Sequence, residues 1–357
     1  MIIILKGSDI CRYMKSVSGL LYLDNDFVEA HGIMEGNGLS IEEGPLENPD
    51  IQGIILPMPV NCHTHLGDAF IEVPENATVE ELVAPPDGLK HRMLAQVDRS
   101  KQVSAMAGAA RLMASTGVRR FIDFREGGVE GSKILLDAVE GTGTSPVIFG
   151  RPKGEYGPQE MDSLLELVHG IGLSAISDRP FGELREISSH VKGTGKALGF
   201  HASEARQEPM DKILDLEPDL LVHMIKADYR DLKACADANI PIVVCPTANS
   251  YFGLKPPVRR MLDAGITVCL GTDNAMLASP DIFREMRFLK ANFDLGPEEI
   301  LRIVFENGGK VLNSLPGLWA ADGENQGFFV LKASIDDPWG SVIGARPEKM
   351  HLFDSPE

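Results

Sequence analysis

The feature that most constrains the fold of this chain is a repeated alternation of short apolar runs with helical stretches across residues 55–319. The apolar runs have strand length and end near eight positions, at residues 65, 121–125, 146–151, 173–178, 201, 223, 242–245 and 268–273. We expect helices between them at residues 90–115, 131–140, 160–169, 229–238, 258–264 and 281–293. A (β/α)8 TIM barrel requires eight strands that alternate with helices, so the sequence predicts this α/β fold.

The two ends of the chain differ from the middle. Residues 1–5, 19–23 and 27–30 are β-prone runs between turns, and runs of the same character recur at residues 327–331 and 341–343. A few short strands cannot bury a face alone, so we expect the two ends to pair with each other. The sequence therefore predicts a small β-sandwich domain from residues 1–54 and 320–357 and a barrel from residues 55–319.

Two histidines, His63 and His65, close the first apolar run of the predicted barrel. Side chains two residues apart on a strand point to the same face, so both imidazoles can bind one metal ion. Such a pair often arises by chance, but four further polar residues follow later runs: His201, Glu204, His223 and Asp273. Active sites of TIM barrels lie at the carboxyl ends of the strands, where all six residues fall. This agreement between position and chemistry predicts a metal-dependent hydrolase.

The predicted metal ligands are three neutral imidazoles, from His63, His65 and His201, and the carboxylate of Asp273. This set of nitrogen and oxygen atoms suits one divalent ion, Zn2+ in the first place or Fe2+, and leaves room for a water molecule. The other histidines lie away from the strand ends, and we expect them to be structural or surface residues: His31, His91, His169, His190 and His351.

Hydrolysis by a metal-activated water needs a proton acceptor for that water, a proton donor, and a group that orients the attacked centre. Asp273 can accept the proton, Glu204 can carry it to the substrate, and His223 can polarise or orient the attacked centre. Two alternatives stay open at this stage. Glu204 can instead be a salt-bridged residue at the start of a helix, and His223 can be a hydrogen-bonded core histidine.

Three arginines, Arg125, Arg151 and Arg179, follow the second, third and fourth predicted strands. A guanidinium pairs well with carboxylate or phosphate, so these residues are candidates to bind an acidic substituent of a substrate. Internal pairing is an equally strong alternative, because carboxylates lie close to them in sequence: Asp123, Glu126, Asp178 and Glu183.

Over nearly its whole length the chain resembles the amidohydrolase superfamily, in particular the branch with cytosine deaminase, guanine deaminase and S-adenosylhomocysteine/methylthioadenosine deaminase. The resemblance rests on H-x-H after strand one, H-x-x-E after strand five, a strand-six histidine, a strand-eight aspartate, and residues 244–249 and 264–274. It implies a mononuclear site held by His63, His65, His201 and Asp273. Binuclear members carry a bridging carboxylated lysine at the end of strand four, and residues 174–179 contain no lysine.

The resemblance also implies an activity, namely hydrolytic deamination of an amino-substituted heterocycle of nucleobase, nucleoside or pterin type, with release of ammonia. The alternative is hydrolysis of a cyclic or linear amide C–N bond, as in imidazolonases. A binding or scaffolding protein on the same barrel is a third hypothesis, but such a protein would be expected to have lost metal ligands, and this chain retains all of them.

Composition narrows the partners of the protein. The formal net charge of −18 leaves no basic stripe for phosphates, so we expect neither nucleic acid nor a membrane surface as a partner, only a small heterocyclic substrate. No apolar stretch approaches a membrane span, and the scattered cysteines lack metal-binding spacing, which predicts a cytoplasmic protein with reduced thiols. The sequence leaves homo-oligomerisation open. Residues 66–90 form a long connection that is a candidate lid.

Overall fold

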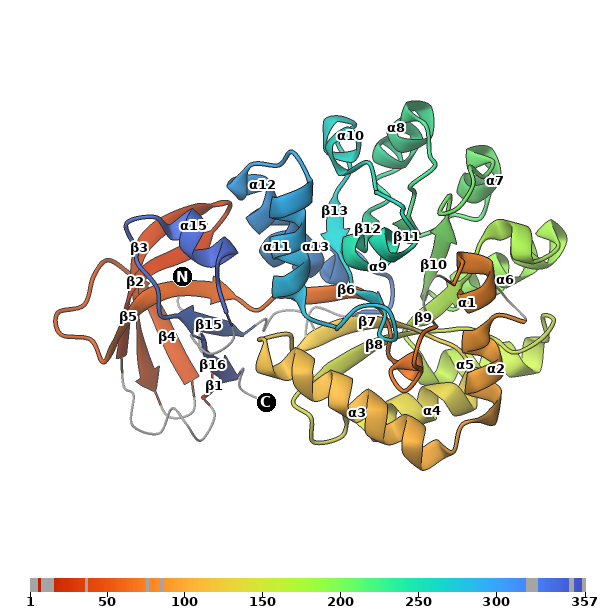
Figure 1. The fold of residues 1–357 in the computed structure, drawn as a ribbon, viewed down its shortest axis with the longest axis horizontal. Coiled ribbons are helices and arrows are strands. Elements are labelled where there is room, and N and C mark those ends of the chain that lie inside the picture. Colours follow the sequence, from red (N-terminus) through yellow and green to blue (C-terminus); the bar gives the residue numbers. More distant parts are fainter. Residues whose placement is uncertain are drawn as a thin grey trace.

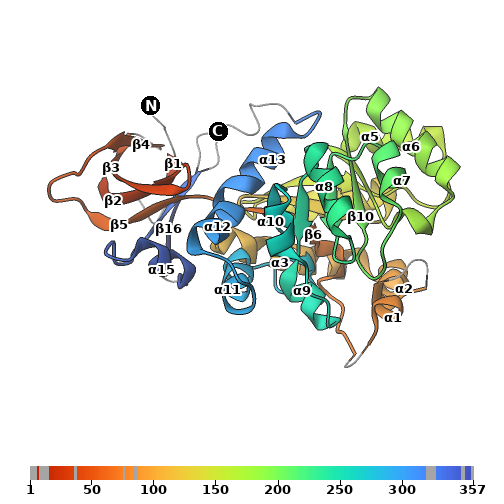
Figure 2. The ribbon, with the colours of Figure 1, turned by 90° about the horizontal axis from the view of Figure 1, so that it is seen from above.

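The computed structural model describes residues 6–7, 16–35, 38–74, 77–83, 87–318, 327–346 and 350–354. Figure 1 shows a small β-sheet beside a larger ring of strands that is surrounded by helices. Figure 2 shows from above that both ends of the chain lie on the side of the small sheet, away from helices α5 to α7. The predicted first strand, residues 1–5, lies outside the described residues.

The large sheet is a closed barrel of parallel strands. Each strand pairs with the next in chain order, and the last one returns to pair with the first, Asp273 opposite Thr64 and Asn274 opposite His65. This closure confirms the predicted (β/α)8 barrel. The final barrel strand consists of two short pieces on either side of Gly271 and Thr272, so the nine strands of the sheet form eight barrel strands. The strands are β6 (Val60–His65), β7 (Arg120–Arg125), β8 (Ser145–Gly150), β9 (Gly170–Leu173), β10 (Ala197–Ala202), β11 (Leu220–His223), β12 (Ile242–Val244), β13 (Val268–Leu270) and β14 (Asp273–Asn274).

Helices connect these strands and cover the outside of the barrel (Figure 1). They are α1 (Val79–Val83), α2 (Leu89–Gln96), α3 (Arg99–Ser115), α4 (Gly128–Val139), α5 (Pro158–Leu167), α6 (Phe181–Gly193), α7 (Met210–Asp215), α8 (Tyr229–Asp237), α9 (Pro246–Tyr251), α10 (Val258–Asp263), α11 (Ile282–Asn292), α12 (Pro297–Leu301) and α13 (Gly308–Ser314). Local sequence explains several starts. Asp228 caps α8 by accepting from the backbone of Arg230 and Asp231, and Asp281 caps α11 in the same way.

Three predicted elements were wrong. The expected helix at 90–115 is two helices, because Val97 and Asp98 adopt extended backbone angles that end α2 and restart the chain as α3. The expected strand at 341–343 is part of α15 (Pro338–Ile343), where Asp337 caps the helix and Pro338 suits its first turn. The fourth barrel strand ends at Leu173 rather than at Asp178, because Ile176–Asp178 form a turn of 3-10 helix.

The two chain ends meet in one seven-stranded sheet, as the sequence predicted. Its order is β1 (Lys6–Gly7), β16 (Met350–Asp354), β15 (Phe328–Leu331), β5 (Ile51–Pro57), β2 (Ser16–Leu23), β3 (Asp26–Glu35) and β4 (Gly38–Glu43). The sheet folds over so that β4 approaches β1 and β16. Apolar side chains such as Val17, Ile55 and Val330 fill the space inside it. The domain limits at residues 54 and 320 stay a prediction.

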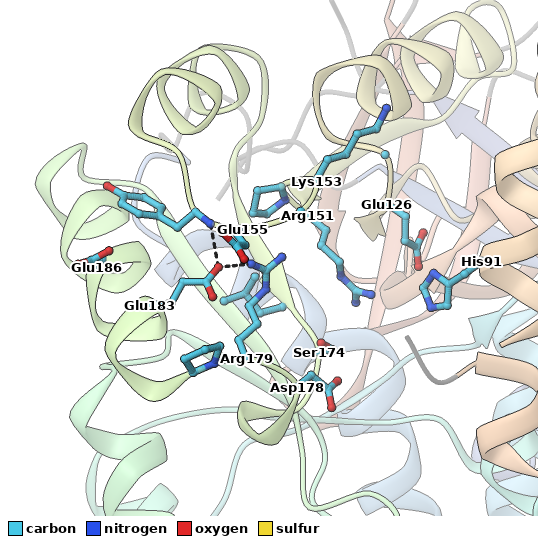
Figure 3. A pocket seen from close by; sticks show the side chains of 16 residues that line it. His91, Glu126, Arg151, Lys153, Glu155, Ser174, Asp178, Arg179, Glu183 and Glu186 are labelled. Carbon is cyan, nitrogen blue, oxygen red and sulfur yellow. Dashed lines mark hydrogen bonds and ion pairs between the residues drawn. The ribbon is translucent and has the colours of Figure 1, made fainter. Parts of the chain in front are cut away.

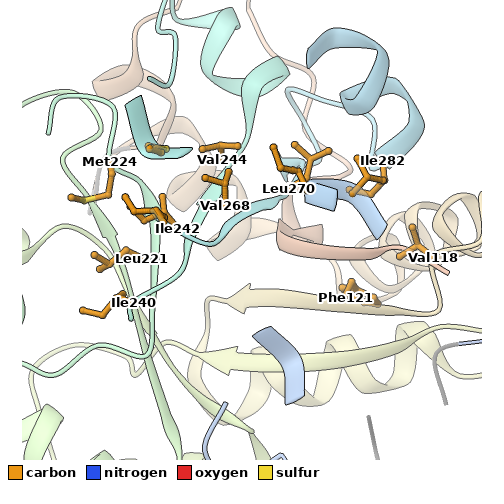
Figure 4. Packing of buried hydrophobic residues seen from close by; sticks show 14 of the residues in the cluster. Val118, Phe121, Leu221, Met224, Ile240, Ile242, Val244, Val268, Leu270 and Ile282 are labelled. Carbon is orange, nitrogen blue, oxygen red and sulfur yellow. The ribbon is translucent and has the colours of Figure 1, made fainter. Parts of the chain in front are cut away.

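Two layers of apolar side chains hold the barrel together. Alternation along each strand sends one set inward, including Ile122, Phe149 and Val222, and the other set outward against the helices. Figure 4 shows the outward layer, where Leu221, Ile242, Val244, Val268 and Leu270 pack in one continuous cluster. In the part of the chain that the structure describes, no helix has the length and apolar character needed to cross a membrane.

Barrel closure depends on the absence of a side chain at Gly271. A Cβ atom there would lie 2.8 Å from Cβ of His63 and 2.9 Å from its backbone nitrogen, closer than real contacts allow. Gly271→Ala should therefore cost about 1–3 kcal/mol of unfolding free energy by overpacking and should displace His63. Gly108→Ala in α3 is the matched control, because no atom lies within 4 Å of the added methyl and a helical alanine is favoured. Urea unfolding of both variants measures the difference, and equal stabilities would contradict this account of closure.

Candidate metal centre and active site

The side chains of His63, His65, His201 and Asp273 converge inside the mouth of the barrel. The Nε2 atom of His201 lies 3.2 Å from Nε2 of His63 and 3.2 Å from Nε2 of His65. The Oδ1 atom of Asp273 lies 3.3 Å from Nε2 of His63 and 3.6 Å from Nε2 of His65. The structure therefore brings together three imidazole nitrogens and one carboxylate oxygen that lie far apart in the sequence.

This arrangement fits a divalent metal ion. Ligand atoms about 2.0–2.1 Å from a tetrahedral zinc ion lie about 3.3 Å from one another, which matches the observed separations. Burial lowers the pKa of His65 to about 3 and lowers those of His63 and His201 as well, which keeps the imidazoles neutral. The nitrogen atoms of neutral imidazoles are ligands suited to a cation.

Outer contacts orient two of the imidazoles. Nδ1 of His201 donates to the carbonyl oxygen of Leu173 at 2.8 Å, and Nδ1 of His65 lies 2.9 Å from the carboxylate of Glu126. A proton on each Nδ1 leaves the Nε2 lone pair facing the centre of the cluster. Nδ1 of His63 is buried without a hydrogen-bond partner among the described residues.

Asp273 is held as a carboxylate. Burial alone would raise its pKa, but the hydrogen bond with His63 and the nearby His223 and His65 bring the pKa well below its usual range. The side-chain amide of Asn274 donates to Oδ1 of Asp273 at 2.9 Å. The backbones of Asp273 and His223 have positive φ angles of 62° and 76°, which non-glycine residues rarely adopt. Such strain is often found at functional sites.

Glu204 and His223 lie beside this cluster. Nε2 of His223 lies 3.6 Å from Oε1 of Glu204 and 3.9 Å from Oδ2 of Asp273. The side-chain amide of Asn249 lies 3.2 Å from Nδ1 of His223 and donates to Glu204 at 3.4 Å. Because that amide donates to Nδ1, the proton of a neutral His223 resides on Nε2 and faces the site. Burial raises the pKa of Glu204, which favours its protonated form.

A buried carboxyl group supports the helix that carries Asn249. Glu285 of α11 accepts a hydrogen bond from the backbone nitrogen of Thr247 at 3.1 Å, in the first turn of α9. Burial raises the pKa of Glu285 to about 7. This contact fixes the start of α9 and hence the position of the Asn249 amide.

The cluster opens into a cavity of about 480 Å³ that is lined by the candidate catalytic residues. Val83 of α1 and Lys90 of α2 also line it, so the segment predicted to be a lid reaches the site. Leu82 buries its side chain, and Tyr251 donates to the carbonyl oxygen of Pro74 at 3.0 Å. Pro85 and Pro86 of this segment lie outside the described residues.

A second cavity of about 800 Å³ adjoins the first and shares Arg151, Ser174 and Asp178 with it. Figure 3 shows Arg151 between Glu126 and His91 on one side and Ser174 and Asp178 on the other. Arg151 donates from Nε to the carbonyl oxygen of Gly172 at 3.4 Å. Within the described parts of the chain, no carboxylate forms an ion pair with the Arg151 guanidinium. Burial lowers the pKa of Arg151.

The three arginines therefore differ. Arg125 is buried and pairs with Glu126 at 2.6 Å and Asp123 at 3.5 Å, and it does not line either cavity. Arg179 lines the outer cavity but is paired with Glu183 (Figure 3). Internal pairing accounts for both, so Arg151 is the arginine whose surroundings suit a ligand.

Sequence reasoning missed three residues that the structure places at the site. Glu126 was considered only as an arginine partner, although it directly follows a barrel strand. Asn249 and Asn274 lie within the stretches 244–249 and 264–274 that carry the family resemblance, which was the available signal. The corrected end of the fourth strand still has no lysine, because Ser174 and Ala175 follow β9.

Comparisons with known proteins agree with this geometry. The sequence profile of the Amidohydrolase family matches residues 54–315. The chain belongs to the amidohydrolase family. A protein of Methanothermobacter thermautotrophicus, named as a candidate aminohydrolase, is 31% identical over 327 residues, which are 84% of each chain. The 5-methylthioadenosine/S-adenosylhomocysteine deaminase of Halobacterium salinarum is 30% identical over 121 residues, 29% of this chain and 28% of that protein.

Two solved structures of zinc-containing proteins share the fold. The atrazine chlorohydrolase of Arthrobacter aurescens matches with a TM-score of 0.73 and 14% identity over 95% of each chain. An adenosine deaminase of Xanthomonas campestris matches with a TM-score of 0.73 and 13% identity over 94% of this chain and 90% of that chain. At this level of identity the likeness concerns the fold.

Proposed function

We propose that the protein is a metal-dependent aminohydrolase that deaminates an amino-substituted heterocycle and releases ammonia. The observation that carries this proposal is the placement of Glu204. Its carboxyl group has a raised pKa and lies beside His223, within the cavity that contains the histidine and aspartate cluster. A proton donor in this position serves a reaction in which a ring nitrogen and departing ammonia must be protonated. The aminohydrolase and deaminase names of the relatives point the same way.

His63, His65, His201 and Asp273 would hold one divalent ion, and Zn2+ is the preferred ion, with Fe2+ the alternative. The bound ion would act as a Lewis acid that lowers the pKa of a water molecule. Zinc in the two structural neighbours supports this choice. Asp273, held ionised by its histidine neighbours, would accept the proton of that water.

The remaining residues would position the substrate and move protons. The Nε2–H group of His223 would donate a hydrogen bond to a polar atom beside the attacked carbon and so orient that centre, because Asn249 occupies the other ring nitrogen. Glu204 would deliver its proton to the ring nitrogen and would regain one from the hydroxyl group of the addition product, with its carboxyl group oriented by the Asn249 amide. The proton accepted by Asp273 would pass to the departing amino group, which leaves as ammonia. Val83 and Lys90 narrow the cavity from the side of the barrel opening and would help to exclude bulk water.

Arg151 would bind an anionic substituent of the substrate. Its guanidinium lies at the junction of the two cavities, so a heterocycle at the metal would extend past Arg151 into the outer cavity. The alternative function is hydrolysis of a cyclic or linear amide, which the same metal set could perform. Release of ammonia from a ring amino group separates the two functions.

The proposed function is tested by screening protein loaded with zinc or iron against pterins, purines, pyrimidines and nucleosides. We expect ammonia release from one of these classes and about one metal ion per chain by elemental analysis. Two ions bound with comparable affinity would contradict the mononuclear site. Turnover of amides without any ammonia from heterocycles would favour the alternative function.

Glu204→Gln tests the proton donor. Glutamine keeps the size of the side chain but cannot deliver a proton, so kcat should fall by about 10²- to 10⁴-fold. Metal content should stay at the wild-type level, because Glu204 is not among the proposed ligands. A variant that retains more than about a tenth of wild-type kcat, where chemistry limits the rate, would remove Glu204 from the mechanism.

Arg151→Met tests the anion site. Loss of a charged hydrogen-bond donor should raise KM for an acidic substrate, with a loss of about 2 kcal/mol or more of binding free energy. The KM of a neutral analogue should be nearly unaffected. Arg125→Met is the comparison variant, because its guanidinium is paired internally and should affect stability instead. Equal effects of Arg151→Met on both substrates would indicate a structural arginine.

A further inference from the structure

Among the residues that the structure describes, Lys90 is the one lysine that lines the inner cavity. It comes from the second residue of α2, in the long connection between β6 and β7, and not from the end of a barrel strand. Its side chain is only 4% exposed. Moving an ammonium group out of water costs free energy unless the group is paired and hydrogen-bonded. The contacts of the Lys90 ammonium therefore indicate its role.

Three polar groups from three different segments of the chain surround the Lys90 ammonium. Nζ lies 2.6 Å from Oε1 of Glu126, after β7, and donates to Oδ1 of Asn274, in β14, at 3.0 Å. It also lies 3.8 Å from Oδ2 of Asp68, after β6. Lys90 therefore ties together the ends of the first, second and last barrel strands, which are neighbours in the closed barrel.

Two of these partners hold proposed metal ligands. The Oε1 atom of Glu126 that contacts Lys90 also lies 2.9 Å from Nδ1 of His65. The amide of Asn274 accepts from Lys90 with its oxygen and donates to Oδ1 of Asp273 with its nitrogen at 2.9 Å. The ammonium fixes the direction of this amide, because a rotated Asn274 would place its NH2 group against Lys90 and its oxygen against the carboxylate of Asp273.

The charge of Lys90 also stabilises the charge of Glu126. The ammonium of Lys90 and the carboxylate of Glu126 lie 2.6 Å apart and form a buried ion pair. An ionised Glu126 polarises the Nδ1 proton of His65 and strengthens Nε2 as a donor to a cation.

From these contacts we propose that Lys90 is a positioning residue for the metal centre, which orders His65 through Glu126 and Asp273 through Asn274. Docking of the α1–α2 segment on the barrel thereby completes the site. Nε2 of His91 donates to the carbonyl oxygen of Val83 at 3.1 Å, so a hydrogen bond joins α2, which carries Lys90, to α1. This inference rests on the proposed metal site and not on the identity of the substrate.

The test compares zinc affinity, measured by competition with a chromophoric chelator, in the wild-type protein and three variants. Lys90→Met removes the charge and keeps a side chain of similar length. Zinc should bind to this variant about 10- to 100-fold more weakly, as for other residues that contact metal ligands from outside. Lys90→Arg keeps the charge with a different shape and should recover part of the affinity. Arg92→Met is the control on the same helix, because Arg92 is exposed and should leave zinc affinity unchanged.

A second measurement separates positioning from general stability. Thermal unfolding of the metal-free proteins measures the stability that Lys90→Met loses when the Glu126 carboxylate is left unpaired. Zinc affinity of Lys90→Met should fall even at temperatures where the metal-free variant is fully folded. For any substrate from which the enzyme releases ammonia, Lys90→Met should lower kcat by a larger factor than it changes KM. The reason is that the variant alters the geometry of the metal ligands and retains the cavity that binds the substrate. Zinc affinity of Lys90→Met within about 3-fold of wild type would overturn the proposal, and so would an equal loss in Arg92→Met.

Asn274→Leu keeps the test decisive if Lys90→Met does not fold. This variant cuts the arm from Lys90 to Asp273 and leaves the contact of Lys90 with Glu126 in place. About 10-fold weaker zinc binding would support the proposal, and unchanged binding would overturn it. Tight zinc binding by the wild type without any ammonia release would refute the proposed deaminase activity alone, since the zinc measurements would remain valid.

Discussion

The parallel pairing of β14 with β6 is the contact on which the rest of the site depends. It places Asp273 opposite Thr64, between the two histidines of the first strand, and closes the barrel into a ring. Gly271 permits this approach because its missing side chain leaves room for His63. Without closure, the carboxylate of Asp273 and the imidazoles of His63 and His65 would belong to opposite edges of an open sheet.

Burial then turns this geometry into chemistry. The same desolvation keeps the imidazoles neutral, favours a protonated Glu204, and makes an ionised Asp273 depend on its histidine neighbours. The pKa values of two carboxyl groups in one cavity are thus moved in opposite directions, upward for Glu204 and downward for Asp273. A proton acceptor and a proton donor side by side are what hydrolytic deamination requires.

The outer contacts come from parts of the chain that are not barrel strands. Lys90 reaches the centre from α2, and Asn249 reaches it from α9, which Glu285 supports from α11. Both act on groups that touch the cluster. The connecting segments therefore contribute to the order of the site as well as covering it, and Arg151 lines both cavities at the barrel opening.

The sequence by itself determined the barrel and the residues at its strand ends, because the period of apolar residues and the positions of His63, His65, His201, Glu204, His223 and Asp273 are local properties of the chain. It could not determine where helices break at Val97 and Asp98, or that 341–343 is helical, since capping and packing decide such boundaries. Only the tertiary structure distinguished Arg151 from the internally paired Arg125 and Arg179, and only it revealed Lys90. Ion pairing and burial depend on groups that are distant in sequence. The residues next to Lys90 in the sequence do not indicate that Glu126 and Asn274 contact it in the folded protein.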